Sequence, residues 1–454
     1  MKKFNITLAI CLVSILIFES ISFAQWSSVV QFNNIGPFPR ICVVDSNVVW
    51  AAGGLSSPVI YRTINGGQNW TVIPVSGLPF RLASIAAKDS VNAFVCDYGS
   101  FSGGGNAKLF KTTNAGINWI LIDSTGGTDG FFDGIVFSKT QPEFGIALSE
   151  NPIGSGLPFY LFRTSDSGQN WINTYPPGIA NYYGWAYSVF AIDHMFYGFM
   201  KVNITNYGAD SYMTSNGGSS WYSGGESVYN TGFGDIVFSD NKLTGIMLCS
   251  NYLPNIKRTT NGGINWVTEN TMLDILTGAT ACWITGTNTV FICSQSSVSA
   301  RNTFRSDDGG MSWVSQNTSS VDKLFEMDYA KYNNLIVAYS ISSTGHVLKS
   351  RQSVQTIGVQ QIGNIVPPGF SLSQNYPNPF NPVTNIEFGL PKFGFVSLKV
   401  YDALGKEAAT LINDILSPGN YHVEFDGSNL TSGVYYYRLK TDNYISTKKM
   451  LLIK

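Results

Sequence analysis

Two aspartates, Asp133 and Asp235, come closest in type and placement to a catalytic pair. Each stands at the expected start of a β-strand, and nearby loops carry further acids at Asp129, Glu226 and Asp274. Glycoside hydrolysis uses two carboxyl groups roughly 5 to 9 Å apart, one as the acid and one as the base or nucleophile. Carboxylates at loop ends are also commonly just solvated. The pair therefore indicates either a glycoside hydrolase site or an ordinary polar rim.

The sequence shows no motif for metal-dependent, nucleophilic or nucleotide chemistry. The three histidines, at His194, His346 and His422, are scattered and show no metal-ligand spacing. Neither a G-x-S-x-G elbow nor a phosphate-binding G-x-x-x-x-G-K-[ST] loop is present. With 13% charged residues and a formal net charge of -1, the chain has no basic stripe for nucleic acid. We expect no metal, no cofactor and no nucleic-acid partner.

Aromatic residues gather in the long loops, which favours ligand binding. They are Phe131, Phe132, Tyr182, Tyr183, Trp185, Tyr229 and Phe233. Flat rings beside Asn, Ser and Gly suit sugars or peptides, because the rings offer apolar faces and the polar neighbours orient the ligand. The same rings could instead pack the loops onto the strands. We expect a glycan or protein ligand on this face.

A nine-residue motif recurs six times and must position these loops. In its first copy, RTINGGQNW over 62–70, a hydroxyl residue is followed by Asn, Gly and Trp at fixed spacing. The Asn or Asp side chain can bind backbone N–H groups of its own turn, while Gly takes the positive φ that closes it. We assign this structural role, and no catalytic one, to Asn65, Asn114, Asp166, Asn216, Asn261 and Asp308.

The spacing of the motif predicts an all-β fold. Its tryptophans lie 49, 52, 50, 45 and 47 residues apart, which suits four-stranded propeller blades. Three strand-like runs follow the sixth motif without a fourth, and QWSSVV over 25–30 can supply it. We predict a seven-bladed β-propeller over 25–350, closed by N- and C-terminal strands, which leaves no open sheet edge. Six blades are the alternative.

The pattern S/T-x-D/N-x-G-x-x-W resembles the Asp-box, or BNR, repeat of sialidases, sortilin-type receptors, some glycoside hydrolases and photosystem-assembly-factor-like propellers. The resemblance implies the propeller fold and places the repeat on the outer rim. It does not imply a function, since the scaffold hosts unrelated activities. Arg40 resembles the arginine before the first sialidase repeat, but two partner arginines lack convincing positions. The arginines in or before the motifs, Arg62, Arg163, Arg258 and Arg305, are expected at exposed rim positions.

The N-terminus predicts export. Two lysines, an apolar run over 8–18 and small residues in Ser22-Phe23-Ala24 indicate a signal peptide over 1–24, cleaved after Ala24. No later segment offers about 20 apolar residues for a membrane span. The remaining cysteines, Cys42, Cys96, Cys249, Cys282 and Cys293, are expected as small buried side chains. A bridge between Cys282 and Cys293 is the alternative.

The C-terminal part differs from the repeats. A polar linker over 351–369 leads to strand-like runs over 370–454, which predict a small Ig-like β-sandwich. This tail resembles the type A C-terminal sorting domain of the type IX secretion system. The resemblance rests on YPNPFNP (376–382), VSLKVYDALGKE (396–407), LTSGVYYYRL (430–439) and KKMLLIK (448–454). It implies recognition by an outer-membrane translocon and a secreted or cell-surface location.

These features predict a secreted or cell-surface propeller that binds a glycan or protein. The alternative is a glycoside hydrolase with a carboxylate pair at the channel mouth, and we favour the binding protein over the enzyme. A structural surface component is a third option.

Overall fold

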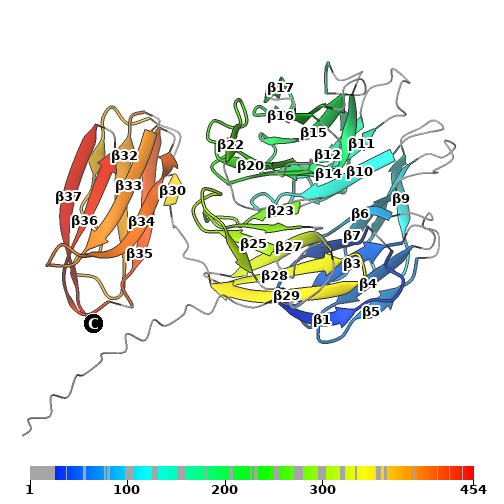
Figure 1. The fold of residues 1–454 in the computed structure, drawn as a ribbon, viewed down its shortest axis with the longest axis horizontal. Helices are drawn as coiled ribbons and strands as arrows, with labels where there is room; N and C mark the ends of the chain where they lie inside the picture. The colour runs from blue at the N-terminus through cyan, green and yellow to red at the C-terminus, as the bar shows by residue number, and fades with distance from the viewer. Residues whose placement is uncertain are drawn as a thin grey trace, which may run out of the picture.

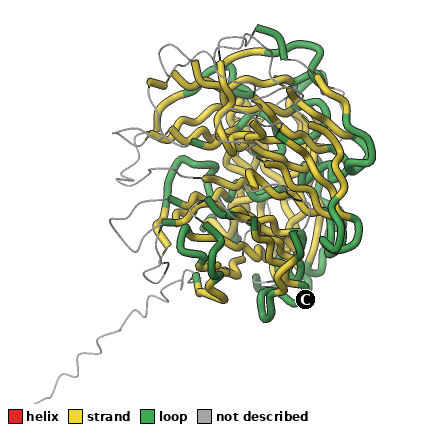
Figure 2. The backbone as a smooth tube through the Cα atoms, turned by 90° about the vertical axis from the view of Figure 1, so that its right-hand side faces the viewer, coloured by secondary structure: helices red, strands yellow, loops and turns green. Residues whose placement is uncertain are grey.

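The computed structural model describes residues 26–454 with gaps in the loops. The residues left out are 37, 55–57, 76–77, 79–81, 98–106, 125–130, 151–159, 175, 179–181, 204–207, 225–227, 230–233, 250–254, 270–279, 295–302, 317, 319–322, 333–334, 354–358, 362–365, 393, 417, 429 and 442. The expected signal peptide lies outside the described residues. The described chain consists of strands and loops (Figure 2), and none of it forms a helix that could span a membrane.

Seven antiparallel sheets, six of four strands and one of five, form the N-terminal part (Figure 1). Blades 1 to 3 are β2 (Arg40–Val43), β3 (Val49–Gly53), β4 (Val59–Thr63), β5 (Thr71–Ile73); β6 (Leu82–Ala87), β7 (Ala93–Asp97), β8 (Lys108–Thr112), β9 (Ile120–Ser124); and β10 (Phe131–Phe137), β11 (Gly145–Glu150), β12 (Tyr160–Thr164), β13 (Ile172–Thr174). Blade 4 is β14 (Tyr182–Ala191), β15 (Tyr197–Asn203), β16 (Gly208–Thr214) and β17 (Tyr222–Ser223), and β18 (Val228–Tyr229) also pairs with β16. Blades 5 to 7 are β19 (Asp235–Phe238), β20 (Gly245–Cys249), β21 (Asn255–Thr259), β22 (Val267–Glu269); β23 (Thr280–Trp283), β24 (Val290–Cys293), β25 (Thr303–Ser306), β26 (Val314–Gln316); and β27 (Leu324–Tyr332), β28 (Leu335–Ser342), β29 (His346–Ser353), β1 (Ser27–Gln31).

The first strands of the blades form a closed ring. Each of β2, β6, β10, β14, β19, β23 and β27 contacts the first strand of the next blade, and β27 contacts β2. Apolar side chains fill the spaces between blades, which explains why the inner strands are nearly continuous apolar runs. The predicted seven-bladed propeller is confirmed, and the six-bladed alternative is wrong.

The N-terminal strand closes the last blade. In Figure 1 the blue β1 lies beside the yellow β29, and Ser27 pairs with Lys349 and Gln31 with His346. Trp26 is fully buried, and its Nε1 donates to Oε1 of Gln316 in blade 6 at 2.7 Å. The indole therefore attaches the closing strand to the neighbouring blade as well as to its own.

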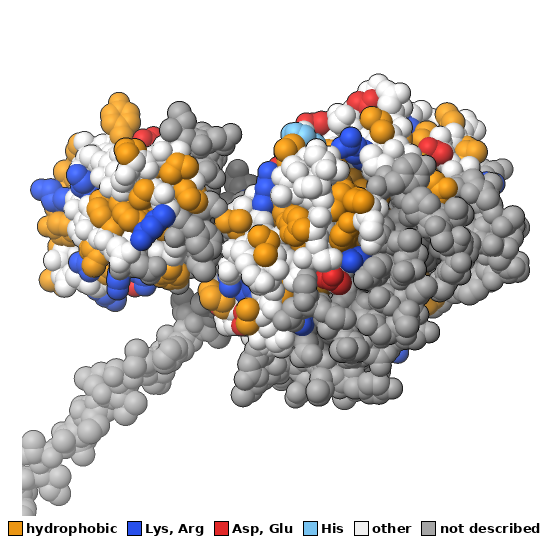
Figure 3. All heavy atoms as spheres, turned by 90° about the horizontal axis from the view of Figure 1, so that it is seen from above, with side chains coloured by type: hydrophobic (Ala, Val, Ile, Leu, Met, Phe, Trp, Pro, Cys, Tyr) orange, Lys and Arg blue, Asp and Glu red, His pale blue; other side chains and the backbone are white. Residues whose placement is uncertain are grey.

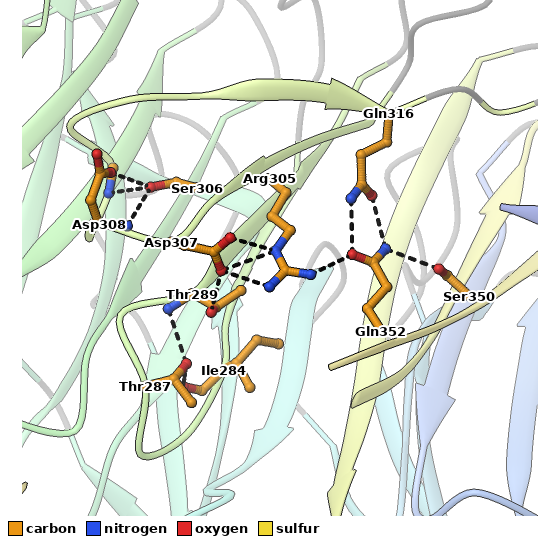
Figure 4. Close-up of polar contacts among 11 residues, drawn as sticks. Ile284, Thr287, Thr289, Arg305, Ser306, Asp307, Asp308, Gln316, Ser350 and Gln352 are labelled. Carbon is orange, nitrogen blue, oxygen red and sulfur yellow. Dashed lines mark hydrogen bonds and ion pairs between the residues drawn. The ribbon is translucent and has the colours of Figure 1, made fainter. Parts of the chain in front are cut away.

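A polar network continues this joint between blades 6 and 7 (Figure 4). The side-chain amides of Gln316 and Gln352 bind each other in both directions, at 2.9 and 3.0 Å. Oε1 of Gln352 also accepts a hydrogen bond from Nη1 of Arg305 at 2.7 Å. Because buried polar groups are costly unless they are paired, this network favours one register of closure.

The motif turns, formed by the six nine-residue repeats, share one hydrogen-bond pattern. In the first, Oγ1 of Thr63 donates to Oδ1 of Asn65 at 2.9 Å and accepts the N–H of Gly67 at 3.0 Å. Oδ1 of Asn65 also accepts the N–H of Asn69. The hydroxyl-to-oxygen bond recurs at Asn114, Asp166, Asn216, Asn261 and Asp308. Gly67 has a φ of 86°, which a residue with a side chain rarely adopts.

In five of the six motifs, the residue that opens the motif connects neighbouring blades. Nη1 of Arg163 donates to the carbonyl of Gly217, and Nε of Arg258 donates to that of Gly309, both at 2.8 Å. Lys111 makes the equivalent contact with Gly168, and Lys349 in blade 7, which has no motif, makes it with Gly66. Arg62 reaches the carbonyl of Ser90 in the next blade, and Arg305 reaches Gln352. In blade 4, where Met213 stands, Oη of Tyr222 binds the carbonyl of Gly262 instead. The expectation that Arg62, Arg163, Arg258 and Arg305 occupy exposed rim positions is therefore wrong, because these partly buried side chains hold the blades together.

Two further sheets form the C-terminal domain. Their strands are β30 (Val359–Gln361), β31 (Ser371–Leu372), β32 (Val383–Leu390), β33 (Gly394–Tyr401), β34 (Glu407–Leu416), β35 (Gly419–Asp426), β36 (Gly433–Thr441) and β37 (Tyr444–Leu452). The orders β30-β35-β32-β31 and β34-β33-β36-β37 enclose one apolar core that draws on both sheets. The expected linker 351–369 contains the end of β29 and all of β30. An Ig-like classification of this sandwich stays a prediction.

The described cysteines are free thiols. Cys282 stands opposite Phe291 and Cys293 opposite Thr280, so the alternative bridge between Cys282 and Cys293 is wrong. Burial raises the pKa of Cys42 and of Cys293 to about 12, which leaves both as unreactive thiols at neutral pH. The side chain of Cys249 lies outside the described residues.

Candidate functional site

The first strands of all seven blades surround a central cavity of about 480 Å³. Its wall also includes the turns that follow several of these strands. The charged or titratable groups on the wall include Lys88, Lys139, Asp235, Asp240, Glu326 and Asp328. The wall of the channel thus mixes polar and apolar surface and carries several acids.

Asp235, the first residue of β19, lies on this wall. Its Oδ1 accepts the N–H of Ile236 at 2.8 Å, and its Oδ2 accepts the N–H of Ala281 in blade 6 at 2.9 Å. Burial raises the pKa of Asp235 to about 7, although both N–H donors and the charge of Arg40 lower it. The carboxyl group therefore connects the first strands of blades 5 and 6.

Glu326 on β27 is a second acid of the wall, which the patterns above do not single out. Its Oε2 accepts the N–H of Ile41 in blade 1 at 2.6 Å, and its Oε1 lies 3.9 Å from Nη1 of Arg40. Burial raises the pKa of Glu326 to about 7 against the effect of Arg40. One sequence signal could have found it: Glu326 and Asp328 alternate along one strand and so share a face.

Arg40, the first residue of β2, is buried near Glu326, at the face of the ring where the first strands begin. Its side chain is 1% exposed, and its Nε donates to the carbonyl of Ala83 in blade 2 at 3.1 Å. The guanidinium thus contacts the blades on both sides of its own. Arg40 therefore joins neighbouring blades. This structural role accounts for its position without a bound ligand that carries a carboxylate.

Lys139 crosses the opposite end of the channel. It follows β10 in blade 3, and its Nζ lies 3.0 Å from Oδ1 of Asp328 and 2.9 Å from the carbonyl of Val43. A third bond, of 3.1 Å, reaches the carbonyl of Tyr329. Burial lowers the pKa of Lys139, yet the charge of Asp328 outweighs it and the pKa is raised, so the ammonium group stays charged. Since first and third strands end on the same face, Lys139 bridges the channel at the face that bears the motif turns.

Asp133 is placed differently from Asp235. It lies at a β-bulge of β10, is 3% exposed, and is not among the described residues that line the cavity. Its Oδ2 has no hydrogen-bond partner among the described residues. Burial raises the pKa of Asp133 to about 8, so the group holds its proton at neutral pH. The structure therefore does not bring the two predicted aspartates together on the channel wall.

The predicted ligand-binding rings divide into two groups. Phe132 is fully buried and packs on Phe162, with ring centroids 5.7 Å apart, so its ring has no free face for a ligand. The remaining rings have side chains outside the described part of the structure: Phe131, Tyr182, Tyr183, Trp185, Tyr229 and Phe233. The backbone places Tyr182, Tyr183 and Trp185 in β14 and Tyr229 in β18. The expectation that Phe132 contacts a ligand is therefore wrong, because its ring belongs to the core between blades 2 and 3.

Metal binding finds no support in the described residues. No group of three or more His, Cys, Asp or Glu side chains among them is arranged to hold an ion.

Several solved structures are similar to this chain at low identity. YCF48 from Cyanidioschyzon merolae is 15% identical with a TM-score of 0.48, over 72% of this chain and 99% of that chain. YCF48 bound to D1 peptide is 16% identical with a TM-score of 0.47, over 73% and 97%. The α-L-arabinofuranosidase Arb93A from Fusarium graminearum, in complex with an iminosugar inhibitor, is 10% identical with a TM-score of 0.39, over 73% and 96%. Likenesses this distant carry no argument about function.

No curated protein matches the chain. A family model described as the secretion system C-terminal sorting domain matches residues 374–454. This match covers the C-terminal sandwich except its first two strands, β30 and β31, and confirms the predicted sorting tail. The chain is therefore a β-propeller protein whose C-terminal domain belongs to the type IX secretion sorting domains, and it is exported to the cell surface or secreted.

Proposed function

We propose that the propeller is a noncatalytic binding module that meets its ligand outside the cell. The use of the wall carboxylates supports this most strongly. Asp235 and Glu326 accept backbone N–H groups of the next blade, so their oxygens hold the ring together. A general base or a nucleophile needs a lone pair directed at the substrate. Oxygens already engaged with backbone groups are poorly placed for that task.

The ligand is expected to enter from the face where the first strands begin, because the long loops that carry the aromatic residues emerge there. Lys139 lies at the other face, where its Nζ contacts Asp328 and the carbonyl of Val43. A volume of about 480 Å³ falls in the usual range for a small ligand or a short chain segment. The carboxyl groups and lysines on the wall offer acceptors and donors to hydroxyl or amide groups, so we propose a glycan or a protein segment. The loop aromatics are proposed to contact it outside the cavity.

A glycoside hydrolase is the second candidate, with a different pair from the one expected. Asp235 and Glu326 both line the cavity, and the pKa of each is raised to about 7. A carboxyl group that keeps its proton near neutral pH is what a general acid needs. The charge of Asp235 contributes to the raised pKa of Glu326, so the two groups interact.

The binding module and the glycoside hydrolase differ in whether a bound glycan is cleaved. We would test the full mature chain on a panel of bacterial, plant and animal glycans and of cell-surface proteins, and measure release of reducing sugar from each glycan bound. The binding module predicts retention of at least one ligand with no release. Release that falls by about a hundredfold or more in both Asp235→Asn and Glu326→Gln would favour the hydrolase. Neither binding nor release would leave a structural surface component.

We also propose that residues 1–24 are a signal peptide that is removed during export. N-terminal sequencing of the exported protein is expected to begin at Gln25. A retained N-terminus would contradict a cleaved signal peptide.

A further inference from the structure

The YPNPFNP segment, 376–382, lies along the outer edge of β37. The N–H of Phe380 donates to the carbonyl of Leu451 at 2.9 Å, and the N–H of Ile453 donates to that of Phe380 at 3.0 Å. Oδ1 of Asn378 accepts the N–H of Leu451 at 2.9 Å, as a strand carbonyl would. This part of the sheet edge is therefore already paired, and addition of a partner strand there is blocked.

Most side chains around this segment pack or form hydrogen bonds within the sandwich. Phe380 is 2% exposed and packs into the core of the sandwich. The buried Asn375 donates to Oγ1 of Thr384 at 2.9 Å and to the carbonyl of Pro377 at 3.1 Å. Together with Asn378, these contacts fix the path of the loop on both sides of Tyr376.

Tyr376 is the exception. Its backbone is held at both polar groups, because its N–H and carbonyl each bond with Asn385 at 2.9 Å. Its side chain is nevertheless 80% exposed, and Pro377 and Pro379 beside it are exposed too. Single exposed apolar residues are common, and Figure 3 shows others on this domain. Here, however, a ring and two prolines stand together on a loop whose backbone is held by hydrogen bonds on both sides of Tyr376.

This arrangement lowers the cost of binding. A ring held on a fixed backbone loses little conformational freedom when a partner covers it. Tyrosine supplies a large apolar area with a polar end, and proline offers a rigid face that aromatic-lined grooves recognise. Because residues 374–454 form a sorting domain, the partner that must read this domain is the secretion machinery.

We propose that Tyr376, with Pro377 and Pro379, is a contact surface for the translocon of the secretion system, which would receive the ring and the prolines in an aromatic-lined groove. The proposal rests on the sorting role of the C-terminal domain and is independent of what the propeller binds.

The test replaces Tyr376 in the full-length chain, expressed in a bacterium with a type IX secretion system. We would measure the ratio of exported to periplasmic protein and the Tm of each variant. Tyr376→Ala is expected to lower the ratio about tenfold or more, as loss of a central aromatic contact does, and to shift the Tm by less than about 3 °C. Tyr376→Phe, which keeps the ring, is expected to export like the wild type.

Leu404→Ala provides the matched control, since Leu404 is 94% exposed in a turn of the same domain. Wild-type export of Tyr376→Ala, or an equal defect in Leu404→Ala, would overturn the proposal. If Tyr376→Ala lowers the Tm, Tyr376→Glu replaces it, and wild-type export of a folded Tyr376→Glu would be equally decisive against the proposal. A chain lacking 370–454 distinguishes failure of the sorting role from failure of the Tyr376 surface. Export of this chain would refute the sorting role of the domain. Its retention, together with normal export of Tyr376→Ala, would refute only the contact surface at Tyr376.

Discussion

Replacement of Asp133 by Asn should make the propeller more stable, and increasingly so as the pH rises. The pKa of Asp133 is raised from 3.8 to about 8 by burial, and its Oδ2 has no partner among the described residues. Between these two pH values the unfolded chain releases the proton while the folded chain keeps it. The unfolded state then binds fewer protons, so the free energy of unfolding falls as the pH rises. Asparagine has no proton to hold and removes this loss.

The magnitude follows from the two pKa values. At pH 7 the folded chain keeps a proton about three pH units above the usual pKa, which costs about 4 kcal/mol. The new amide N–H₂ needs an acceptor, and a buried donor without one costs about 1–3 kcal/mol. We therefore expect Asp133→Asn to raise the free energy of unfolding by about 1–3 kcal/mol at pH 7. Near pH 4 the gain from the lost titration is absent, and the variant should be no more stable than the wild type.

Urea unfolding of both proteins at pH 4, 5, 6, 7 and 8 measures this difference directly. Comparison of variant and wild type cancels the titration of Asp235 and Glu326, whose pKa values are also raised. A gain that does not change with pH, or a variant less stable than the wild type at pH 8, would refute the buried, protonated state of Asp133.

Three further substitutions test the joints of the fold by urea unfolding or hydrogen exchange. Trp26→Ala removes a fully buried indole and should lower the free energy of unfolding by about 3–5 kcal/mol; a loss below about 1 kcal/mol would mean that the closing strand contributes little. Arg258→Met removes the bond to the carbonyl of Gly309 and should cost about 1 kcal/mol, and an unchanged midpoint would argue against a stabilising role for that contact. Asn378→Ala should speed exchange of the Leu451 amide, and unchanged protection would show that the edge does not depend on the side chain.

The repeat carried most of the information about the fold. Turn chemistry at positions such as Asn65 and Gly67 depends on a few adjacent residues, so a single sequence reveals it. The count of strands after the last motif predicted the pairing of β1 with β29, because a propeller blade needs four strands and only one segment was left to supply the last. The tail was predictable because four separate segments match a known sorting domain in order.

The channel was harder to predict. Whether an acid at the start of a strand faces the channel or a space between blades depends on local bulges, and the bulge at Asp133 moved that residue out of the wall. Glu326 lay in a run expected only as a strand, although its alternation with Asp328 marked a shared face. The arginines of the motifs looked exposed because their partners are carbonyls of the next blade, which no local pattern reveals.

Closure of the ring can be tested by a cross-strand disulfide. Gln31 and His346 are paired in the β1–β29 ladder, and both side chains lie outside the core, so Gln31→Cys/His346→Cys should form a bond in the exported protein. Gln31→Cys/Lys349→Cys displaces one partner by three residues, about 10 Å along the strand, and should not. A bond in the first variant alone, seen as a mass loss of about 2 Da that reductant reverses, is expected if β1 completes blade 7. Equal bonding in both, or none in the first, would contradict a ring closed in this register.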